Sequence, residues 1–460
     1  MSFDVFIHRV KLFAFLTLIL IFLAIAAKKW LQRFPLSSKL RFARRDKADG
    51  IVFGWAVPGL VAYSPAEKEG HIAVLGGSGL GKTSAILIPT LRAWSGAVFA
   101  IDISGDICSN VPGEKLIFNP FGADRKTVYD PFYHLAALQS AEEQDEALER
   151  LAIMLMPLPP NIAENAAYFI KGGRKILSAT LIAGYHAGRD FPSICRTIIT
   201  HSFEDLFELL RHQNLEQVNS YLNSFSDTNE KNTAGCKQSC DDAIRLFASN
   251  HIVREALRRP SFGETAVSPL DLDDKRLFVV IPAEYLAQVA PLLRLITQQV
   301  LEHIHTRPLD SAVPLLLALD EFSSLGSLEL LPAFQTARKH RVRIMILTQS
   351  LADLDLTYGP FERRSIIDNC SFLVILGATD HETQLYLAEC VGKTQTLRET
   401  ISIDGFSKAM HSYTPELQHH ILPQDFARLG DDLIVLYPGG FARLKKSFYF
   451  RKKKKGKWHG

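Results

Sequence analysis

Cysteine is scarce in this chain, with six residues among 460, and no two of them form a Cys-x-x-Cys pair. This density is far below that of a small secreted domain held together by disulfides, which excludes that class. Cys236 and Cys240 have helical spacing, but no other Cys or His stands near them to complete a metal site. We therefore expect buried or neutral thiols in a reducing compartment.

The chain also has little net charge, because 52 Lys and Arg residues nearly balance 49 Asp and Glu residues. A composition of 47% hydrophobic and 22% charged residues excludes an intrinsically disordered protein. The charge is uneven, since residues 1–50 carry ten Lys and Arg against three acids, and residues 443–460 carry nine against none. We expect a mildly acidic body of two or three domains between two basic ends.

One uncharged apolar run comes close to the length needed to cross a membrane, residues 12–27 (LFAFLTLILIFLAIAA). At 1.5 Å per residue it spans about 24 Å, slightly less than a hydrocarbon core of ~30 Å, and flanking lysines and Trp30 extend it. More Lys and Arg follow the run than precede it, which places the body in the cytoplasm. A cleaved signal peptide is the alternative, because residues 24–26 read Ala-Ile-Ala. We predict an uncleaved single-pass anchor over residues 1–34, with its helix at about 12–30.

Short, nearly all-apolar runs predict strands that are covered on both faces, as in a parallel sheet with helical crossovers. These runs are residues 71–75, 97–101, 277–281, 314–319, 343–347, 372–376 and 433–437. The stretch between the second and third runs differs, because residues 140–155, 168–186 and 240–257 have helical periodicity. Residues 223–233 (NSFSDTNEKNT) are polar and predict a loop. The sequence therefore predicts an α/β protein with an all-α insertion at 131–264.

A phosphate-binding motif follows the first of these runs. The residues Gly76, Gly77, Ser78, Gly79, Leu80, Gly81, Lys82 and Thr83 fit the pattern G-x-x-x-x-G-K-[ST]. Glycines let backbone amides close around phosphate oxygens, Lys82 faces the β- and γ-phosphates, and the Thr83 hydroxyl can bind Mg²⁺. A glycine-rich turn with an incidental lysine is much the weaker interpretation. The motif predicts ATP and Mg²⁺ as cofactors, and it favours the anchor over the signal peptide because nucleoside triphosphates are intracellular.

A second acidic element completes the predicted site. The apolar run 314–319 ends in Asp320 and Glu321. Asp320 would bind the hydration shell of Mg²⁺, and Glu321 would orient and deprotonate the attacking water. The pair is weak by itself, since many strands end in an acid, and becomes specific together with the glycine motif. The combination predicts that the protein hydrolyses the nucleotide rather than only binding it.

Two further candidates lie around the next strand. Gln349 follows the run 343–347, where it can sense the γ-phosphate or the water, although a loop cap explains it equally well. The segment 337–343 (ARKHRVR) is basic. One of its arginines fits three roles alike: an arginine finger toward a neighbouring subunit, a solvated helix end, or a DNA phosphate contact.

Together these motifs resemble the coupling ATPases of type IV secretion and conjugative DNA transfer, which are membrane-anchored, RecA-like hexameric motors related to the FtsK and HerA translocases. The resemblance covers most of residues 50–450. Its marks are residues 76–83 with 88–91, 102–106, 119–121, 129–132, 291–294, 319–322, 349–350 with 353–354, 369–370, and 392–394. Only the order and spacing of the whole set carry weight.

The resemblance implies a RecA-like nucleotide-binding domain at 50–130 and 265–450, interrupted by the all-α domain at 131–264. It places the finger-type arginine on Arg338. It also implies a bacterial inner-membrane location, a homo-hexamer, and partners that include single-stranded DNA, relaxase-type cargo and components of the secretion channel. Two departures stand out: members commonly have two membrane helices where we find one, and often a lysine where this chain has Ser104.

The function predicted from the sequence is an ATP-driven pump that feeds single-stranded DNA with bound relaxase, or effector proteins, to a type IV secretion channel. One alternative is a membrane-tethered cargo receptor in which nucleotide only sets the conformation; Glu321 favours the motor. Another is a DNA translocase of the FtsK type, which the single short anchor and the helical insertion disfavour. The basic tail 451–460 is suited to contacting nucleic acid or anionic lipid, and a tail that is simply solvated explains it equally well.

Overall fold

The computed structural model describes residues 40–68, 70–123, 126–159, 162–226, 228–309, 313–326, 328–403 and 409–451. The predicted anchor helix at 12–30 and nearly all of the predicted tail lie outside these residues. Within them, no helix combines the length and hydropathy needed to cross a bilayer.

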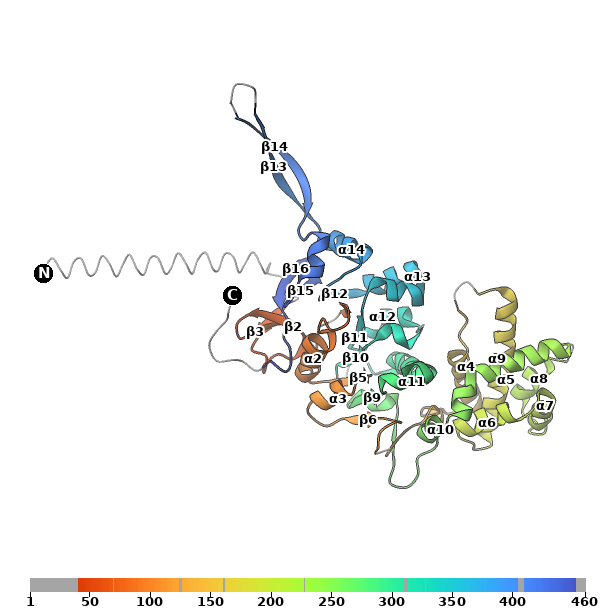
Figure 1. Ribbon diagram of the computed structural model, residues 1–460. Coiled ribbons are helices and arrows are strands. Elements are labelled where there is room, and N and C mark those ends of the chain that lie inside the picture. The colour runs from red at the N-terminus through yellow and green to blue at the C-terminus, as the bar shows by residue number, and fades with distance from the viewer. Residues whose placement is uncertain are drawn as a thin grey trace. The chain divides into compact units, whose positions relative to one another are not determined.

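The chain divides into two compact units. The first unit comprises Met1–Ser95, Thr348–Asp353 and Cys370–Gly460, and the second comprises Gly96–Leu347 and Leu354–Asn369. Figure 1 shows the helices and strands of both units.

The first unit contains a mixed sheet. Its strands, in spatial order, are β1 (Arg41–Ala43), β3 (Leu60–Pro65), β2 (Gly50–Val57), β16 (Gly440–Lys445), β15 (Asp432–Tyr437), β12 (Cys370–Ile375) and β4 (His71–Leu75). Only β12 and β4 are parallel to each other; the remaining neighbours are antiparallel. The prediction of a strand at 433–437 is confirmed, but its expected parallel direction is wrong, because β15 runs antiparallel to β12.

Two helical segments and a hairpin accompany this sheet. A π-helical turn, Lys82–Leu87, continues into α2 (Ile88–Ala93), and α14 spans His381–Val391. Strands β13 (Lys393–Ile403) and β14 (Ala409–His419) pair only with each other and form the long antiparallel hairpin drawn in blue in Figure 1.

The second unit contains a parallel sheet with the order β11 (Val342–Thr348), β10 (Leu315–Leu319), β5 (Ala97–Asp102), β9 (Arg276–Val280) and β6 (Leu116–Phe118). Four of these strands match the predicted apolar runs, and β5, β10 and β11 are buried along their whole length. Strands β7 (Thr127–Tyr129) and β8 (Thr265–Val267) form a small parallel ladder. The prediction of buried parallel strands is confirmed here.

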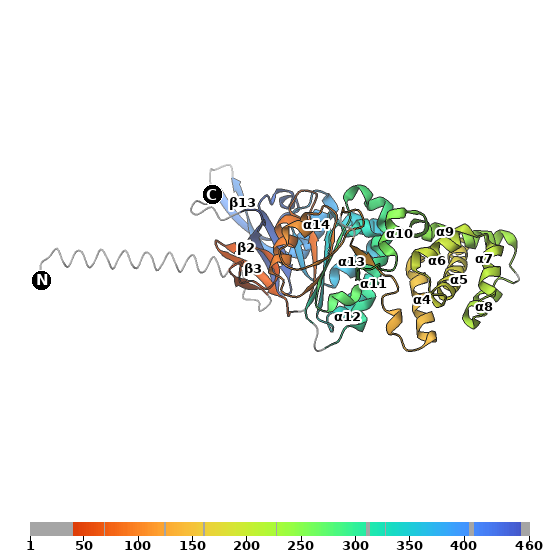
Figure 2. The same ribbon diagram turned by 90° about the horizontal axis from the view of Figure 1, so that it is seen from below.

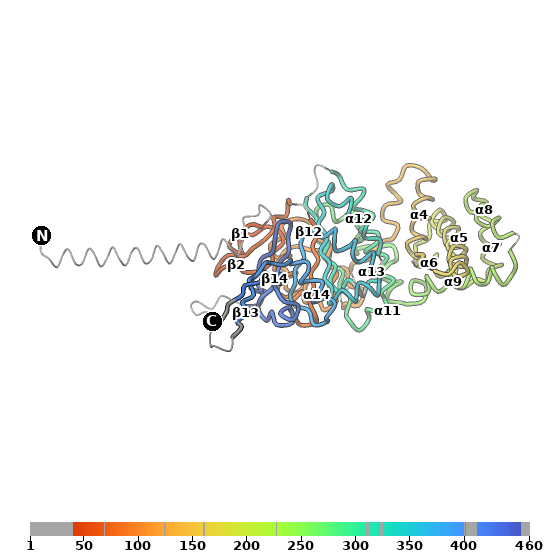
Figure 3. Tube along the Cα trace, turned by 90° about the horizontal axis from the view of Figure 1, so that it is seen from above, coloured from red at the N-terminus to blue at the C-terminus, as the bar shows by residue number. Residues whose placement is uncertain are grey.

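Helices complete the second unit. They are α3 (Asp106–Asn110), α4 (Ala141–Leu155), α5 (Glu164–His186), α6 (Phe191–Thr200), α7 (Phe203–Arg211), α8 (Glu216–Asn223), α9 (Glu230–Ser249), α10 (His251–Leu257), α11 (Leu286–Thr306), α12 (Leu330–Ala337) and α13 (Leu351–Asp368), the last of which begins in the first unit. Helices α4 to α9 gather in one group (Figure 2), and α11 and α12 lie side by side (Figure 3).

Local capping explains where these helices begin, and one helix start corrects a prediction. Ser140 caps α4 by accepting the N–H of Glu143, as expected for a serine before an apolar-periodic run. Asn250 ends α9 and caps α10 by accepting the N–H of Val253, so the helical periodicity of residues 240–257 is confirmed and is divided between two helices. The predicted loop 223–233 is also too long, because α9 already begins at Glu230.

The two helically spaced cysteines are packing residues. Both are buried and free, and they face α5 at its Gly172-Gly173 pair. A Cβ on Gly172 would lie 2.2 Å from Cys236 Sγ, and one on Gly173 would lie 3.1 Å from the Cys240 amide nitrogen. The prediction of buried thiols is confirmed, and burial raises the pKa of Cys240 above its ordinary value.

Candidate functional site

The glycine motif forms the turn between β4 and the helix that follows it. All five residues of β4 are buried, and the loop leaves the sheet at Gly76. Ser78 and Gly79 are exposed at its tip, and a Cβ on Gly79 would meet no atom within 4 Å. The loop therefore has an open side that a ligand can approach.

Two glycines of the loop have backbone conformations that other residues rarely adopt. Gly79 has φ +75° and Gly81 has φ +97°. A side chain at Gly81 would also meet the Phe448 ring, whose Cε1 lies 2.9 Å from the position of a Cβ. Glycine is therefore required at Gly81 by both conformation and space.

Lys82 lies over the loop rather than pointing into solvent. Its side chain is buried, and Nζ donates to the carbonyl oxygen of Gly76 at 2.8 Å and to that of Gly77 at 3.4 Å. These bonds hold the ammonium group against the turn, where it adds positive charge to the amino terminus of the helix. The arrangement suits an anion with several oxygens.

The segment carrying Gln349 lies beside this loop within the first unit. The Gly76 N–H donates to the Thr348 carbonyl oxygen at 3.2 Å. Gln349 is exposed directly after this contact. Ser350 and Asp353 then exchange hydrogen bonds between their side chains and each other's amides, at 3.1 and 3.2 Å, and start α13. The structure thus brings two predicted site elements together, residues 76–83 and Gln349.

Asp320 and Glu321 belong to the second unit, where they follow the carboxyl end of β10. Asp320 is 7% exposed, and its Oδ1 accepts the Glu321 N–H at 3.1 Å. Glu321 is half-buried, and its backbone is in the left-handed α conformation, with φ 48° and ψ 43°. A non-glycine residue in this region is strained, which is a frequent feature of functional positions.

Asp102, at the end of neighbouring strand β5, is a structural acid. Its carboxylate accepts the N–H of Cys108 at 2.6 Å and that of Gly105 at 2.8 Å, and so fixes the start of α3. Burial raises the pKa of Asp102, and these amide bonds oppose that rise. Residues 102–106, one of the motifs that carry the resemblance, therefore form a tight turn that the Asp102 side chain caps.

Arg338 lies at the opposite edge of the second unit's sheet from the acidic pair. It is exposed at the end of α12, before β11 begins, whereas Asp320 follows the last residue of the parallel strand β10. The five residues of β10 span about 16 Å at the usual rise. Arg338 is therefore remote from the acids of its own chain.

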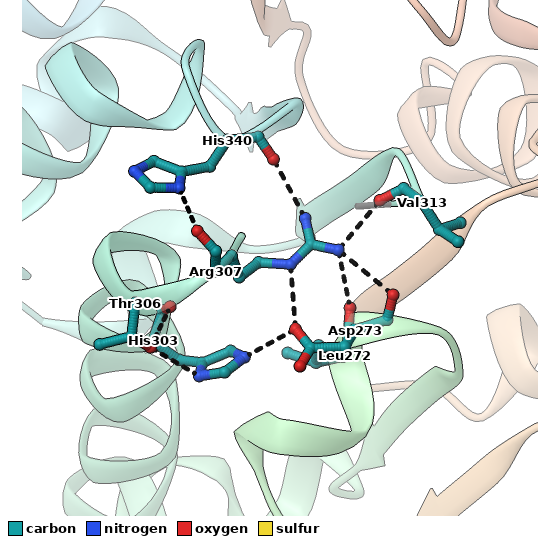
Figure 4. Close-up of polar contacts among 7 residues, drawn as sticks. All are labelled: Leu272, Asp273, His303, Thr306, Arg307, Val313 and His340. Atoms are coloured by element: carbon teal, nitrogen blue, oxygen red, sulfur yellow. Dashed lines mark hydrogen bonds and ion pairs between the residues drawn. The ribbon is translucent and has the colours of Figure 1, made fainter. Parts of the chain in front are cut away.

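The turn that carries Arg338 is anchored by Arg307, whose guanidinium group is buried (Figure 4). It donates to the carbonyl oxygens of His340 at 3.3 Å and Val313 at 2.9 Å, and to the Asp273 carboxylate at 3.3 Å. His340 returns a 2.6 Å contact from Nδ1 to the Arg307 carbonyl oxygen. No pattern in the sequence indicates this network, whose members are scattered from residue 272 to 340.

The residues of the loop fit a nucleotide and a magnesium ion. The open tip, the cation of Lys82 and the hydroxyl of Thr83 match the needs of phosphate oxygens and a hard cation. Among the described residues, no group of three or more His, Cys, Asp or Glu side chains is placed to hold a metal ion. Magnesium in nucleotide sites is usually bound by substrate phosphates and one or two carboxylates, together with water.

The sequence matches one protein family along nearly its whole length. The family model described as "Type IV secretory system Conjugative DNA transfer" matches residues 23–458. Protein VirD4 of Rhizobium rhizogenes is 28% identical over 371 residues, covering 76% of this chain and 54% of VirD4. Conjugal transfer protein TraG of Rhizobium radiobacter is 23% identical over 437 residues, covering 89% of this chain and 66% of TraG. The chain thus spans about half the length of its VirD4 relatives.

The fold matches a solved protein. The bacterial conjugative coupling protein TrwBΔN70, in its unbound monoclinic form, aligns with a TM-score of 0.69 and 20% identity, covering 91% of this chain and 95% of the solved TrwBΔN70 chain. TrwB has also been solved with a non-hydrolysable ATP analogue, ADPNP, and with ADP and Mg²⁺. The predicted mixed α/β fold is confirmed by this likeness.

Proposed function

Because the chain belongs to the type IV secretory system conjugative DNA transfer family, we propose that it is an ATPase that drives delivery of cargo to a type IV secretion channel. The cargo is single-stranded DNA with bound relaxase, or effector proteins. The observation that carries the proposal is the Lys82 ammonium, held 2.8 Å from the Gly76 carbonyl on an open glycine loop. TrwB, which shares the fold, binds ADPNP, and ADP with Mg²⁺.

The proposed roles follow from the chemistry of each side chain. The amides of residues 76–83 and Lys82 bind the phosphates of ATP, and the Thr83 hydroxyl and Asp320 hold Mg²⁺, which neutralises phosphate charge when bound. Glu321 orients the attacking water and accepts its proton. Gln349 senses the γ-phosphate from its position after Thr348, whose carbonyl accepts the Gly76 N–H.

We assign Arg338 to a neighbouring subunit's nucleotide. Its exposure, and its place at the sheet edge opposite Asp320, support a role between subunits rather than within one. This role requires a closed assembly, for which we propose a homo-hexamer. The proposed domains are a RecA-like domain at 50–130 and 265–450 and an all-α domain at 131–264.

We further propose that residues 1–34 anchor the protein in the bacterial inner membrane through one helix at about 12–30. The support is the uncharged run 12–27 and the excess of Lys and Arg after it. The basic stretch 451–460 is proposed to contact DNA phosphates or anionic lipid.

The test is ATP hydrolysis by the full chain, with and without single-stranded DNA. We expect hydrolysis that DNA stimulates, and that Lys82→Ala lowers by about 100-fold or more, because the main cation on the phosphates is lost. Glu321→Gln should still bind ATP but not hydrolyse it.

The outcomes separate the candidate functions. Stimulation by DNA supports a DNA pump, whereas hydrolysis that responds only to protein cargo supports effector delivery. A chain that binds ATP without hydrolysing it would be a receptor switched by nucleotide. Hydrolysis that survives Lys82→Ala would remove the glycine loop as the site.

A further inference from the structure

The helix behind the phosphate loop carries a proline at the position whose N–H would otherwise serve two of its carbonyl groups. The Ile88 N–H bonds to the Thr83 carbonyl, five residues back. With the same spacing, the Ser84 carbonyl would accept the N–H of residue 89. With the ordinary α-helical spacing of four residues, the Ala85 carbonyl would accept the N–H of residue 89 as well. Residue 89 is proline, which has no N–H.

The end of the described chain supplies one donor to each of the two carbonyls. We name Lys446–Arg451 the C-terminal strap; it follows β16 within the first unit. The Ser447 hydroxyl donates to the Ala85 carbonyl oxygen at 3.0 Å, across 362 residues of sequence. The Tyr449 N–H donates to the Ser84 carbonyl oxygen at 3.0 Å. Ser447 is fully buried, so loss of its hydroxyl would leave a buried carbonyl unsatisfied.

Between these two bonds, the Phe448 ring packs on the phosphate loop. A Cβ on Gly81 would lie 2.9 Å from Phe448 Cε1, so the ring covers the residue directly before Lys82. Two arginines also contact Phe448, one from outside the strap and one from within it. The Arg45 side chain donates to the Phe448 carbonyl oxygen at 3.3 Å, and the Arg451 guanidinium lies 4.4 Å from the centre of the Phe448 ring.

We propose that the C-terminal strap is a positioning element of the nucleotide site: it fixes the π-helical turn and the Gly81 backbone in the conformation that binds nucleoside di- and triphosphates. This proposal rests on the proposed nucleotide function of the loop. The amides of residues 81–83 begin the helix whose carbonyls the strap holds, so movement of that helix changes their aim at phosphate. Ser447 and Tyr449 act through the helix, and Phe448 acts through Gly81.

The first experiment titrates the full chain with a fluorescent ADP analogue. Phe448→Ala should weaken binding roughly tenfold, a loss that corresponds to about one hydrogen bond to phosphate. Phe450→Ala is the matched control: it removes a ring of the same size from the strap, but Phe450 is 58% exposed and the ring nearest to Gly81 is that of Phe448. Lys82→Ala reports separately on the proposed function, because it should abolish binding whether or not the strap matters.

The second experiment restores the missing donor from inside the helix. Ser447→Ala should weaken binding of the same analogue roughly tenfold, and Pro89→Ala, which provides an N–H four residues after Ala85, should return the double variant to within about twofold of the parent. A melting curve for each variant separates folding from binding.

The third measurement uses a probe in the strap itself. The fluorescence of a Phe448→Trp variant should change when ADP binds, and that of Phe450→Trp should change much less. The proposal is overturned if Phe448→Ala and Ser447→Ala bind the analogue as tightly as the parent, even with lowered melting temperatures, or if the fluorescence of Phe448→Trp does not respond to ADP. If the parent chain itself binds no nucleotide, the proposed function fails and the strap's role fails with it.

Discussion

The backbone N–H of Glu321 bonds back to Oδ1 of Asp320 at 3.1 Å, while Glu321 itself is left-handed, with φ 48° and ψ 43°. This conformation costs a residue other than glycine about 1–2 kcal/mol. The bond orients the Asp320 carboxylate, and the strained turn places the Glu321 side chain directly after the buried strand. Strain of this kind persists where function requires it.

Glu321→Gly should therefore stabilise the protein while abolishing hydrolysis. Relief of the strain is worth about 1 kcal/mol, which would raise the melting temperature by about 2–4 °C. Glu321→Ala is the control, because it removes the same carboxylate but keeps the left-handed strain. Differential scanning calorimetry of the two variants measures the effect, and equal melting temperatures would show that the turn stores no strain.

The place of Arg338 predicts complementation between two inactive variants. Lys82→Ala and Arg338→Ala should each lack ATPase activity alone. In a mixed ring, an Arg338→Ala subunit keeps an intact phosphate loop, and a Lys82→Ala neighbour can supply it with an intact Arg338. When equal amounts mix at random, roughly a quarter of the interfaces have this arrangement. A mixture prepared by co-expression should therefore hydrolyse ATP well above the sum of the separate variants.

The matched control is Lys339→Ala, which removes an exposed basic residue next to Arg338. This variant should keep its ATPase activity without any partner variant. If Arg338→Ala alone keeps most of the activity, or if the mixture never exceeds the sum of its parts, the finger lies elsewhere.

Much of the phosphate loop was predictable because its chemistry is local. The glycines, Lys82 and the buried strand before them are contiguous, so spacing alone indicates the turn. The apolar runs likewise predicted where strands lie. They did not predict direction, since β15 is as apolar as a parallel strand and yet pairs antiparallel with β12.

The strap and the Arg307 network were missed because their partners are distant in sequence. Pro89 reads as an ordinary residue in the first turn of a helix, and nothing at Ser447 indicates a partner 362 residues away. The break at Asn250 was hidden for another reason: a capping asparagine inside an apolar-periodic stretch does not interrupt the pattern.

Arg307 should be a major contributor to the stability of the second unit. Its buried guanidinium group pairs with Asp273 and bonds to the carbonyls of His340 and Val313 (Figure 4). Arg307→Ala removes the buried donor of these acceptors and should lower the free energy of unfolding by about 2–3 kcal/mol, the scale of hydrogen bonds to a charged group.

Arg307→Lys keeps the charge but not the planar set of donors, so it should recover only part of this loss. Urea unfolding followed by circular dichroism measures both variants. A loss below about 1 kcal/mol for Arg307→Ala would contradict the network's structural role, since that is the scale of an exposed ion pair.

Glu302 on α11 should make stability fall as the pH rises. Burial raises its pKa to about 7, the nearby Arg150 lowers it, and Glu329 raises it. The folded chain therefore binds this proton more tightly than the unfolded chain does, whose Glu has a pKa near 4.5. The stabilisation is fully present below about pH 4.5 and is lost as the pH rises through about 7.

Glu302→Gln stays neutral at every pH and so escapes this loss. We expect it to melt at least about 2 °C above the parent at pH 8 and at the same temperature at pH 5. Glu302→Ala is the control: it should show the same pH trend as Glu302→Gln but melt lower throughout, because it leaves a gap in the packing of α11. A difference between Glu302→Gln and the parent that stays constant from pH 5 to 8 would mean that Glu302 does not titrate in this range.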